Sequence, residues 1–153
     1  MSSRRSVPDF VRESNAIEGI HRDPTELELQ AHETFLAQRE ITVVDMENFV
    51  ANVAGRPLRR AVGQDVRVGD HRPAPGGPEI EVSLKAILAD ANTASRTPYE
   101  VHVAYETLHP FLDGNGRSGR VLWAWQMHNE YEDPFALSFL HRFYYQALDA
   151  SGR

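Results

Sequence analysis

Apolar residues recur every three or four positions along most of the chain, which is the period of one face of an α-helix. Between these segments, polar residues, glycine and proline gather in short runs that are typical of loops. The pattern predicts helices over residues 7–19, 24–37, 45–54, 79–93, 97–108 and 121–127, and a last helix that starts at Asp133. The chain is therefore expected to be mainly α.

Several of these segments carry helix start signals. Asp23 precedes Pro24, which suits an N-cap followed by the first helical residue. Asp45 is expected to open the next helix, and Thr97 and Glu100 have the spacing of a capping box. In the helix over 24–37, the residues expected to face the core are Leu27, Ala31, Thr34 and Phe35.

One helix is expected to lie in the centre of the molecule. Val121, Leu122, Trp123, Trp125 and Met127 are apolar nearly all round the helix rather than on one face. A helix without a polar face is typical of a buried position. The other helices are therefore expected to pack around this one.

The segment over 63–78 differs from the rest of the chain. Residues 65–69 alternate between polar and apolar side chains, and several prolines and glycines follow, which exclude a helix. The alternation predicts a short β-hairpin or an extended flap, although composition alone is equally consistent with a surface loop.

Composition narrows the classes of function. The chain has 153 residues, which fits one domain, and 41% of them are hydrophobic and 25% charged, as in ordinary globular proteins. The net charge of −6 argues against a bulk nucleic-acid binder. The absence of cysteine excludes disulfides and thiol catalysis. Neither a signal peptide nor an apolar run long enough to span a membrane is visible, so a cytoplasmic protein is expected.

The candidate chemistry lies in the string HPFLDGNGRSGR, residues 109–120. Gly114 and Gly116 allow a sharp turn and a close approach of the backbone to a ligand. Because a helix follows, the turn offers unpaired N–H groups to an anion. Arg117 and Arg120 are three residues apart and can close on the same anion.

Two further groups in this string complete the chemistry. Asp113 is a hard oxygen ligand that suits Mg²⁺, and His109 can accept a proton near neutral pH. Taken singly, a loop histidine, an Asn-Gly turn and two spaced arginines are each more often structural or solvated. Their combination in this order favours phosphate-ester chemistry.

The same string resembles the motif of the Fic (Fic/Doc) family, H-P-F-x-D/E-G-N-G-R-x-x-R, with every fixed position filled. Residues 14–19, SNAIEG, are similar to the inhibitory motif found with Fic domains, S/T-x-x-x-E followed by Gly or Asn. By spacing alone, Ser14 and Glu18 are more typical of a surface turn. The resemblance implies that Glu18 pairs with Arg120 and obstructs the γ-phosphate of a productively bound nucleotide.

The resemblance implies a Fic fold, which is a helical bundle around a central buried helix with a short β-hairpin flap before the catalytic loop. A single Fic domain is expected over 1–153. Its parts would be an N-terminal inhibitory helix over 1–20, a flap over 63–78, and the catalytic loop and helix start over 109–120.

The implied activity is that of a protein adenylyltransferase (AMPylator), a nucleotidyltransferase that moves AMP from ATP to a hydroxyl group of a target protein. His109 would be the catalytic base and Asp113 the magnesium ligand. The expected nucleotide-binding residues are Gly114, Asn115, Gly116, Arg117 and Arg120, with Ser14 and Glu18 as the inhibitory pair. Mg²⁺ is the implied cofactor and ATP the co-substrate.

Three different functions are consistent with the same residues. The first is Doc-like phosphotransfer. Doc-like phosphotransferases carry lysine at the position of Gly116, so this glycine favours nucleotidyl transfer over phosphotransfer. The second is removal of AMP from a modified protein, with Glu18 positioning water, and the third is a non-catalytic Fic-fold binding module. The expected partners are ATP and a target protein docked along the flap. A homo-oligomer is possible, and neither direct nucleic-acid binding nor membrane association is expected.

Overall fold

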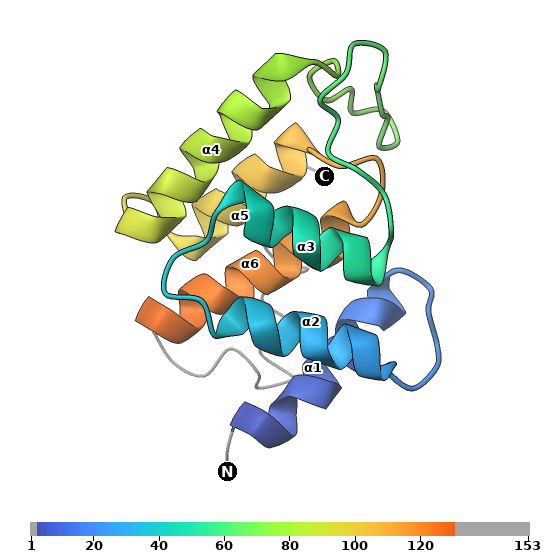
Figure 1. Ribbon diagram of the computed structural model, residues 1–153, viewed down its shortest axis with the longest axis vertical. Helices are drawn as coiled ribbons and strands as arrows, with labels where there is room; N and C mark the ends of the chain where they lie inside the picture. The colour runs from blue at the N-terminus through green and yellow to red at the C-terminus, as the bar shows by residue number, and fades with distance from the viewer. Residues whose placement is uncertain (1–2, 131–153) are drawn as a thin grey trace.

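The computed structural model describes residues 3–130, which form a bundle of helices (Figure 1). The helices of this part of the chain are α1 (Ser3–Ile17), α2 (Glu26–Leu36), α3 (Val43–Val53), α4 (Pro78–Thr93), α5 (Pro98–Leu108) and α6 (Asn115–Glu130). The prediction of a mainly α fold is confirmed. The last expected helix, starting at Asp133, lies outside the described residues.

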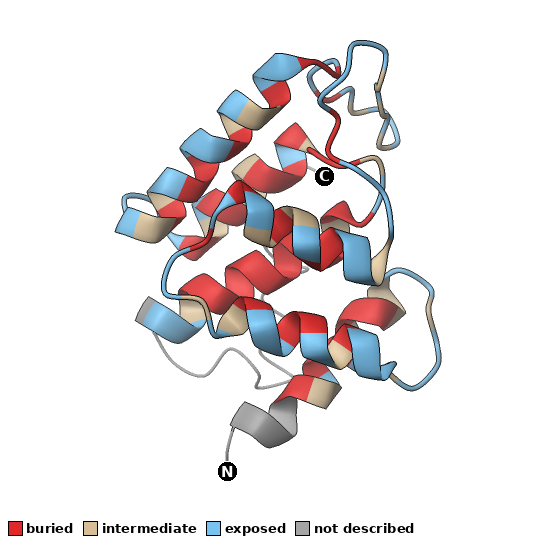
Figure 2. Cartoon of the chain, viewed as in Figure 1, coloured by how far each residue is buried: buried red, intermediate tan, exposed pale blue. Residues whose placement is uncertain are grey.

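Helix α6 occupies the centre of the bundle. It packs against α1, α2, α3 and α5, and residues 121–126 are all buried (Figure 2). An isolated helix with no polar face is unstable in water, and burial on several sides removes that cost. The prediction of a central buried helix is confirmed.

The apolar core has two parts in the described residues. The larger cluster contains residues of all the helices from α2 through α6, among them Phe35, Met46 and Tyr105, together with Phe49 and Phe111. A smaller cluster consists of Val7, Phe10, Val11, Trp123 and Ala124. Helix α1 is thus attached to α6 through an apolar contact of its own.

Two of the predicted helix starts are wrong. Thr25 and Thr42, not Asp23 and Asp45, are the N-caps of α2 and α3. Each threonine hydroxyl accepts the N–H of the residue three positions on, Glu28 or Asp45, whose carboxylate accepts the N–H of the cap. This reciprocal capping box pairs two otherwise unpaired donors, whereas an isolated Asp-Pro pair does not. The capping box at Thr97 is confirmed.

Two of the four residues predicted to face the core from α2 are wrong. Leu27 and Thr34 are exposed, with Leu27 52% accessible, whereas Ala31 and Phe35 are buried. The buried residues of α2 are Glu28, Ala31, His32 and Phe35. Their spacing is that of one helix face. The apolar pattern missed this face because a carboxylate and an imidazole occupy two of its positions.

The segment before α4 forms no strands. Among residues 60–77 the only bridge is between Val68 and His71, whose N–H groups each donate to the other's carbonyl. Gly76 donates its N–H to the Asp65 side chain, and Arg59 donates to the carbonyls of Gln64 and Ala74. Side chains thus satisfy backbone groups that a second strand would pair in a hairpin. The expected β-hairpin is replaced by an irregular segment, which we call the 60–77 loop.

None of the helices within residues 3–130 combines the length and apolar character needed to cross a membrane.

Candidate active site

His109 lies at the C-terminal end of α5. Its N–H donates to the carbonyl of Tyr105 at 2.9 Å, and its backbone is left-handed, with φ 53° and ψ 62°. Pro110 disfavours helical geometry at the preceding residue, so the helix must end here. A left-handed conformation costs a non-glycine residue about 1 kcal/mol or more, and other contacts must hold it in place.

The turn after His109 is shaped by Asn115. Its side-chain oxygen accepts the N–H of Phe111 and its amide group donates to the Phe111 carbonyl, both at 2.8 Å. Phe111 is fully buried in the larger core cluster. Because the Asn115 side chain is engaged in the turn, what Asn115 can offer an anion is its backbone N–H at the start of α6.

Gly114 is required by its backbone and by its neighbours. Its φ is +86°, and a Cβ built there would lie 2.9 Å from Cβ of Ala54. The Ser118 hydroxyl donates to the Gly114 carbonyl at 2.7 Å and contacts the hydroxyl of Tyr105 at 2.6 Å. Burial raises the pKa of Tyr105, so its hydroxyl stays protonated and can donate. This chain of hydrogen bonds fixes the turn against α5.

Asp113 is the candidate magnesium ligand. Its carboxylate is exposed, and Oδ1 accepts the N–H of Gly114 at 2.8 Å, which orients it beside the turn. Within the described part of the chain, no cluster of three or more His, Cys, Asp or Glu side chains could hold a metal ion. One oriented carboxylate fits Mg²⁺, which typically takes one or two carboxylates and completes its shell with phosphate oxygens and water.

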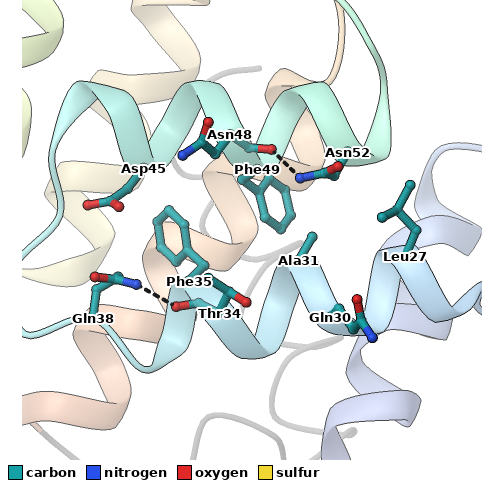
Figure 3. A pocket seen from close by; sticks show the side chains of 10 residues that line it. All are labelled: Leu27, Gln30, Ala31, Thr34, Phe35, Gln38, Asp45, Asn48, Phe49 and Asn52. Carbon is teal, nitrogen blue, oxygen red and sulfur yellow. Dashed lines mark hydrogen bonds between the residues drawn. The ribbon is translucent and has the colours of Figure 1, made fainter.

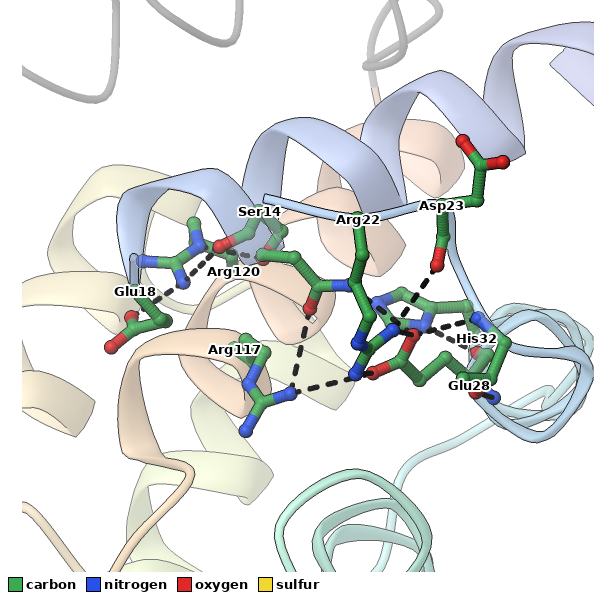
Figure 4. A network of polar contacts seen from close by, with 10 residues as sticks. Ser14, Glu18, Arg22, Asp23, Glu28, His32, Arg117 and Arg120 are labelled. Atoms are coloured by element: carbon green, nitrogen blue, oxygen red, sulfur yellow. Dashed lines mark hydrogen bonds and ion pairs between the residues drawn. The ribbon is translucent and has the colours of Figure 1, made fainter. Parts of the chain in front are cut away.

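Arg120 points from α6 to the end of α1 (Figure 4). Its side chain is 1% exposed. Nε donates to the Ser14 hydroxyl at 2.8 Å, and Nη2 donates to the Ser14 carbonyl at 2.9 Å and to Oε2 of Glu18 at 2.7 Å. The sequence pair Ser14 and Glu18 therefore meets Arg120 directly.

The turn that ends α1 sets the direction of Glu18. The N–H of Gly19 donates to the Ala16 carbonyl, that of Ile20 donates to the Asn15 carbonyl, and Gly19 has φ +81°. This is the Schellman arrangement, in which a glycine follows the last helical residues in the left-handed conformation. A Cβ on Gly116 would overlap Oε2 of Glu18, so the carboxylate lies directly against the first turn of α6.

Arg117 faces a second carboxylate. Its Nη1 lies 3.4 Å from the side-chain oxygen of Asn15 and 3.8 Å from Oε2 of Glu28 (Figure 4). Glu28 is buried and also accepts hydrogen bonds from Arg22 at 2.9 and 3.0 Å. The hydrogen bonds from Arg22 are the main reason that the pKa of Glu28 falls from 4.5 to about 2, despite the opposing effect of burial.

Sequence reasoning missed three residues that shape this site. Asn15 and Glu28 contact Arg117, and Arg59 bonds to the carbonyls of Leu108 and His109. The capping-box spacing of Thr25 and Glu28 was a usable signal for Glu28. No comparable pattern marks Arg59, which sits beside Arg60 and is typical of a surface basic pair.

A pocket between α2 and α3 lies apart from these residues (Figure 3). Leu27, Phe35 and Phe49 are among its lining residues, and none of them belongs to the 109–120 string. The amide of Gln38 donates to the Thr34 carbonyl of α2, and that of Asn52 donates to the Asn48 carbonyl of α3. This pocket therefore presents no group of convergent catalytic side chains.

The fold and the site define a mainly α domain in which a glycine-rich turn leads into a buried central helix. Two arginines of that helix face carboxylates, Arg120 that of Glu18 after α1 and Arg117 that of Glu28 in α2. The Fic/DOC family model matches residues 13–127, and the chain belongs to this family.

The fold is shared with a solved structure. The chain is similar to a Fic domain-containing signaling protein from Bacteroides thetaiotaomicron, with a TM-score of 0.53 and 16% sequence identity. The match covers 91% of this chain and 71% of that chain. At this identity the likeness shows the fold alone. No curated protein sequence matches the chain.

Proposed function

We propose that this Fic/DOC family member is a protein adenylyltransferase, which transfers AMP from ATP to a hydroxyl group of a target protein, and that Glu18 restrains it. The observation that carries the proposal is the contact of the Glu18 carboxylate with both Arg120 and the first turn of α6. A carboxylate held there competes with a phosphate for the same donors.

Binding of the nucleotide uses the start of α6. The backbone N–H groups of Asn115 and Gly116, which follow the turn at Gly114, cradle a phosphate, and Arg117 and Arg120 neutralise the β- and γ-phosphates. Arg120 is buried and its guanidinium is fixed by the Ser14 hydroxyl and carbonyl. A prearranged cation of this kind needs little reorganisation when charge develops on the leaving group.

The reaction is a displacement at the α-phosphorus. His109 removes the proton from the target hydroxyl, and the oxygen forms a bond to the α-phosphorus. The bond between that phosphorus and the bridging oxygen to the β-phosphate breaks, and pyrophosphate leaves. Positioning and charge neutralisation supply most of the catalysis in such transfers.

Asp113, whose exposed carboxylate is oriented by the N–H of Gly114, is the residue that would hold the magnesium ion. When bound, the ion neutralises phosphate charge and stabilises the leaving pyrophosphate. The protein target lies along the 60–77 loop, which borders the end of α5 through the bond of His71 Nε2 to the Thr107 carbonyl.

The experiment compares wild type, Glu18→Gly, and Glu18→Gly with His109→Ala, each incubated with Mg²⁺ and ATP labelled at the α- or the γ-phosphate. We expect Glu18→Gly to raise incorporation of the α-label into protein roughly ten- to hundredfold, since one charge-assisted hydrogen bond of about 1.5–3 kcal/mol is lost. Adding His109→Ala should lower it at least about a hundredfold.

Asp23→Gly is the matched control, because Asp23 is a 93% exposed carboxylate near the end of α1 that pairs with Arg12 and not with Arg120. It should leave incorporation unchanged. Transfer of only the γ-label would overturn the proposal in favour of a Doc-like phosphotransferase. Binding of ATP without transfer of either label, in a lysate and with Glu18→Gly, would favour AMP removal or a non-catalytic module.

A further inference from the structure

Arg59 and Arg120 are the largest fully buried side chains in the described residues, and Arg59 is 0% exposed. Each hydrogen bond of its guanidinium goes to a backbone carbonyl. Nε donates to His109 at 2.8 Å, Nη2 to Leu108 at 3.0 Å, and Nη1 to Gln64 and Ala74 at 3.0 and 2.9 Å.

The backbone of Arg59 adds to these contacts. Its N–H donates to the Pro110 carbonyl at 2.9 Å, and its carbonyl accepts the N–H of Gly77 at 3.0 Å. One residue thus binds three consecutive carbonyls of the turn that carries the base, those of residues 108, 109 and 110. It also binds the 60–77 loop near both of its ends.

Burying the Arg59 guanidinium costs desolvation energy, and its hydrogen bonds to carbonyls offset that cost. Burial lowers the pKa of Arg59, which reflects the desolvation of the guanidinium. The carbonyls at the end of α5 have no intrahelical donors and carry the negative end of the helix dipole. A planar cation with five N–H groups can satisfy several of them at once, which lysine cannot.

We propose that Arg59 is a positioning residue, which holds His109 in its left-handed conformation and joins that conformation to the 60–77 loop. This inference rests on the proposed function, because it treats His109 as the base and the loop as the target-docking segment. A left-handed histidine persists only where its surroundings over-determine it. The bonds from Arg59 to the carbonyls on both sides of His109 and to its own provide that constraint.

The matched control is Arg96, which precedes the N-cap of α5 at the opposite end of that helix from His109. Its side chain is 44% exposed and forms an ion pair with Asp90. Arg59→Lys and Arg96→Lys each keep the charge and remove the fork. Both are made in the Glu18→Gly background, where transfer of the α-label is expected to be measurable.

For Arg59→Lys we expect kcat for AMP transfer to fall roughly ten- to hundredfold while KM for ATP stays within about twofold, because misplacing the base affects the chemical step and not the phosphate cradle. Arg96→Lys should leave both constants unchanged. In Arg59→Ala, added guanidinium ions should recover part of kcat. A lowered Tm with kcat unchanged per folded molecule would mean that Arg59 only stabilises the fold, and would overturn the proposal.

A second measurement does not depend on activity. In protein labelled at histidine, the backbone amide and ring signals of His109 should shift in Arg59→Lys and not in Arg96→Lys, with the Glu18 side chain intact. Unchanged His109 signals in folded Arg59→Lys would reject the positioning role, whether or not the enzyme transfers AMP. If Glu18→Gly transfers no label while the signals shift, the proposed function fails and the coupling of Arg59 to His109 stands.

Discussion

At the scale of single residues, Glu28 shows how a charge is kept inside this domain. Its carboxylate accepts hydrogen bonds from Arg22, from the side chain of Asn15 and from the N–H of Thr25, and lies 3.8 Å from Arg117. Removing a paired charge is costly because its partners remain buried. Glu28 thus links α1, α2 and the first arginine of α6.

The pKa of Glu28 predicts how stability depends on pH. Its ordinary value of 4.5 falls to about 2 in the folded protein, so the folded state binds the proton less readily. The contribution of Glu28 is therefore complete above about pH 4.5 and is lost as the pH falls toward about 2. Allowing for the half-exposed Arg22, it is on the order of 2 kcal/mol.

We expect Glu28→Gln to lower the free energy of unfolding by about 2 kcal/mol at pH 7, measured by urea denaturation. The variant should also lose most of the decline in stability between about pH 4.5 and 2. The decline between about pH 6.5 and 4 should remain, because it comes from His32, whose pKa burial lowers from 6.5 to about 4.

Glu33→Gln, on the exposed side of the same helix, should change neither part of the curve. Equal effects of the two substitutions would show that Glu28 contributes only as a surface charge.

The residues of the site differ in how far sequence could predict them. Gly114, Arg120 and Glu18 stand at fixed positions of short motifs, and the contact of Glu18 with Arg120 is the one that the resemblance implies. Arg59 and Glu28 are charged residues whose neighbours in sequence are also polar, so composition places them on the surface. Their burial depends on partners that are 50 residues or more away in the sequence, and no local pattern carries that information.

At the scale of secondary-structure elements, α5 and α6 approach closely at Gly119. A Cβ on Gly119 would overlap Oε2 of Glu106 and lie 3.1 Å from Cδ1 of Tyr105. Both neighbours are buried, so neither can move into solvent without loss of packing. The glycine in this helix is required by the packing of α5 and not by its own backbone conformation.

Gly119→Ala should therefore destabilise the protein by about 1–2 kcal/mol, since overpacking outweighs the gain of about 1 kcal/mol in helix propensity. Gly55→Ala is the contrasting control. Gly55 has φ +71° with nothing within 4 Å of its Cβ position, so strain alone should cost about 1 kcal/mol. Urea denaturation measures both. A stabilised Gly119→Ala would show that α5 yields easily at this contact.

The elements themselves follow from local patterns more than their ends do. Periodicity predicts the helices around Phe49, Leu84 and Trp125, because each buries one face or more. The predicted starts of α2 and α3 lie two or three residues from the observed N-caps, Thr25 and Thr42. A threonine is recognisable as an N-cap only together with the carboxylate three residues on.

The 60–77 loop shows a different limit of the sequence pattern. Alternating residues predict a strand only where a partner strand exists, and here side chains bind the backbone instead. No local feature of the loop indicates that Arg59 donates to the carbonyls of Gln64 and Ala74.

At the scale of the whole molecule, α1 is joined to α6 by two separate sets of contacts. Val7, Phe10 and Val11 pack on Trp123 and Ala124 of α6. Ser14 and Glu18, one or two turns further along, bind Arg120. Both sets span more than 100 residues of sequence, so only the resemblance to a family motif, and not periodicity, could suggest that α1 reaches the central helix.

This arrangement predicts that the apolar contacts of α1 control the polar ones. Val11 is fully buried against α6, and Val11→Ala removes apolar carbons worth about 2 kcal/mol without changing any residue of the motifs. Because α1 packs against fewer helices than α6, we expect it to open locally before the core does.

In Val11→Ala, amide hydrogen exchange of α1 should become roughly tenfold faster or more, while exchange in α5 and α6 stays close to that of wild type. If Glu18 restrains AMP transfer, the same variant should incorporate the α-label severalfold faster than wild type with Glu18 still present. Val82→Ala on α4 is the control, because Val82 is 59% exposed and its loss should change neither measurement. Faster exchange spread evenly over α1, α5 and α6 would instead show that α1 opens only with the whole domain, and that relief of Glu18 requires a ligand and not a local opening.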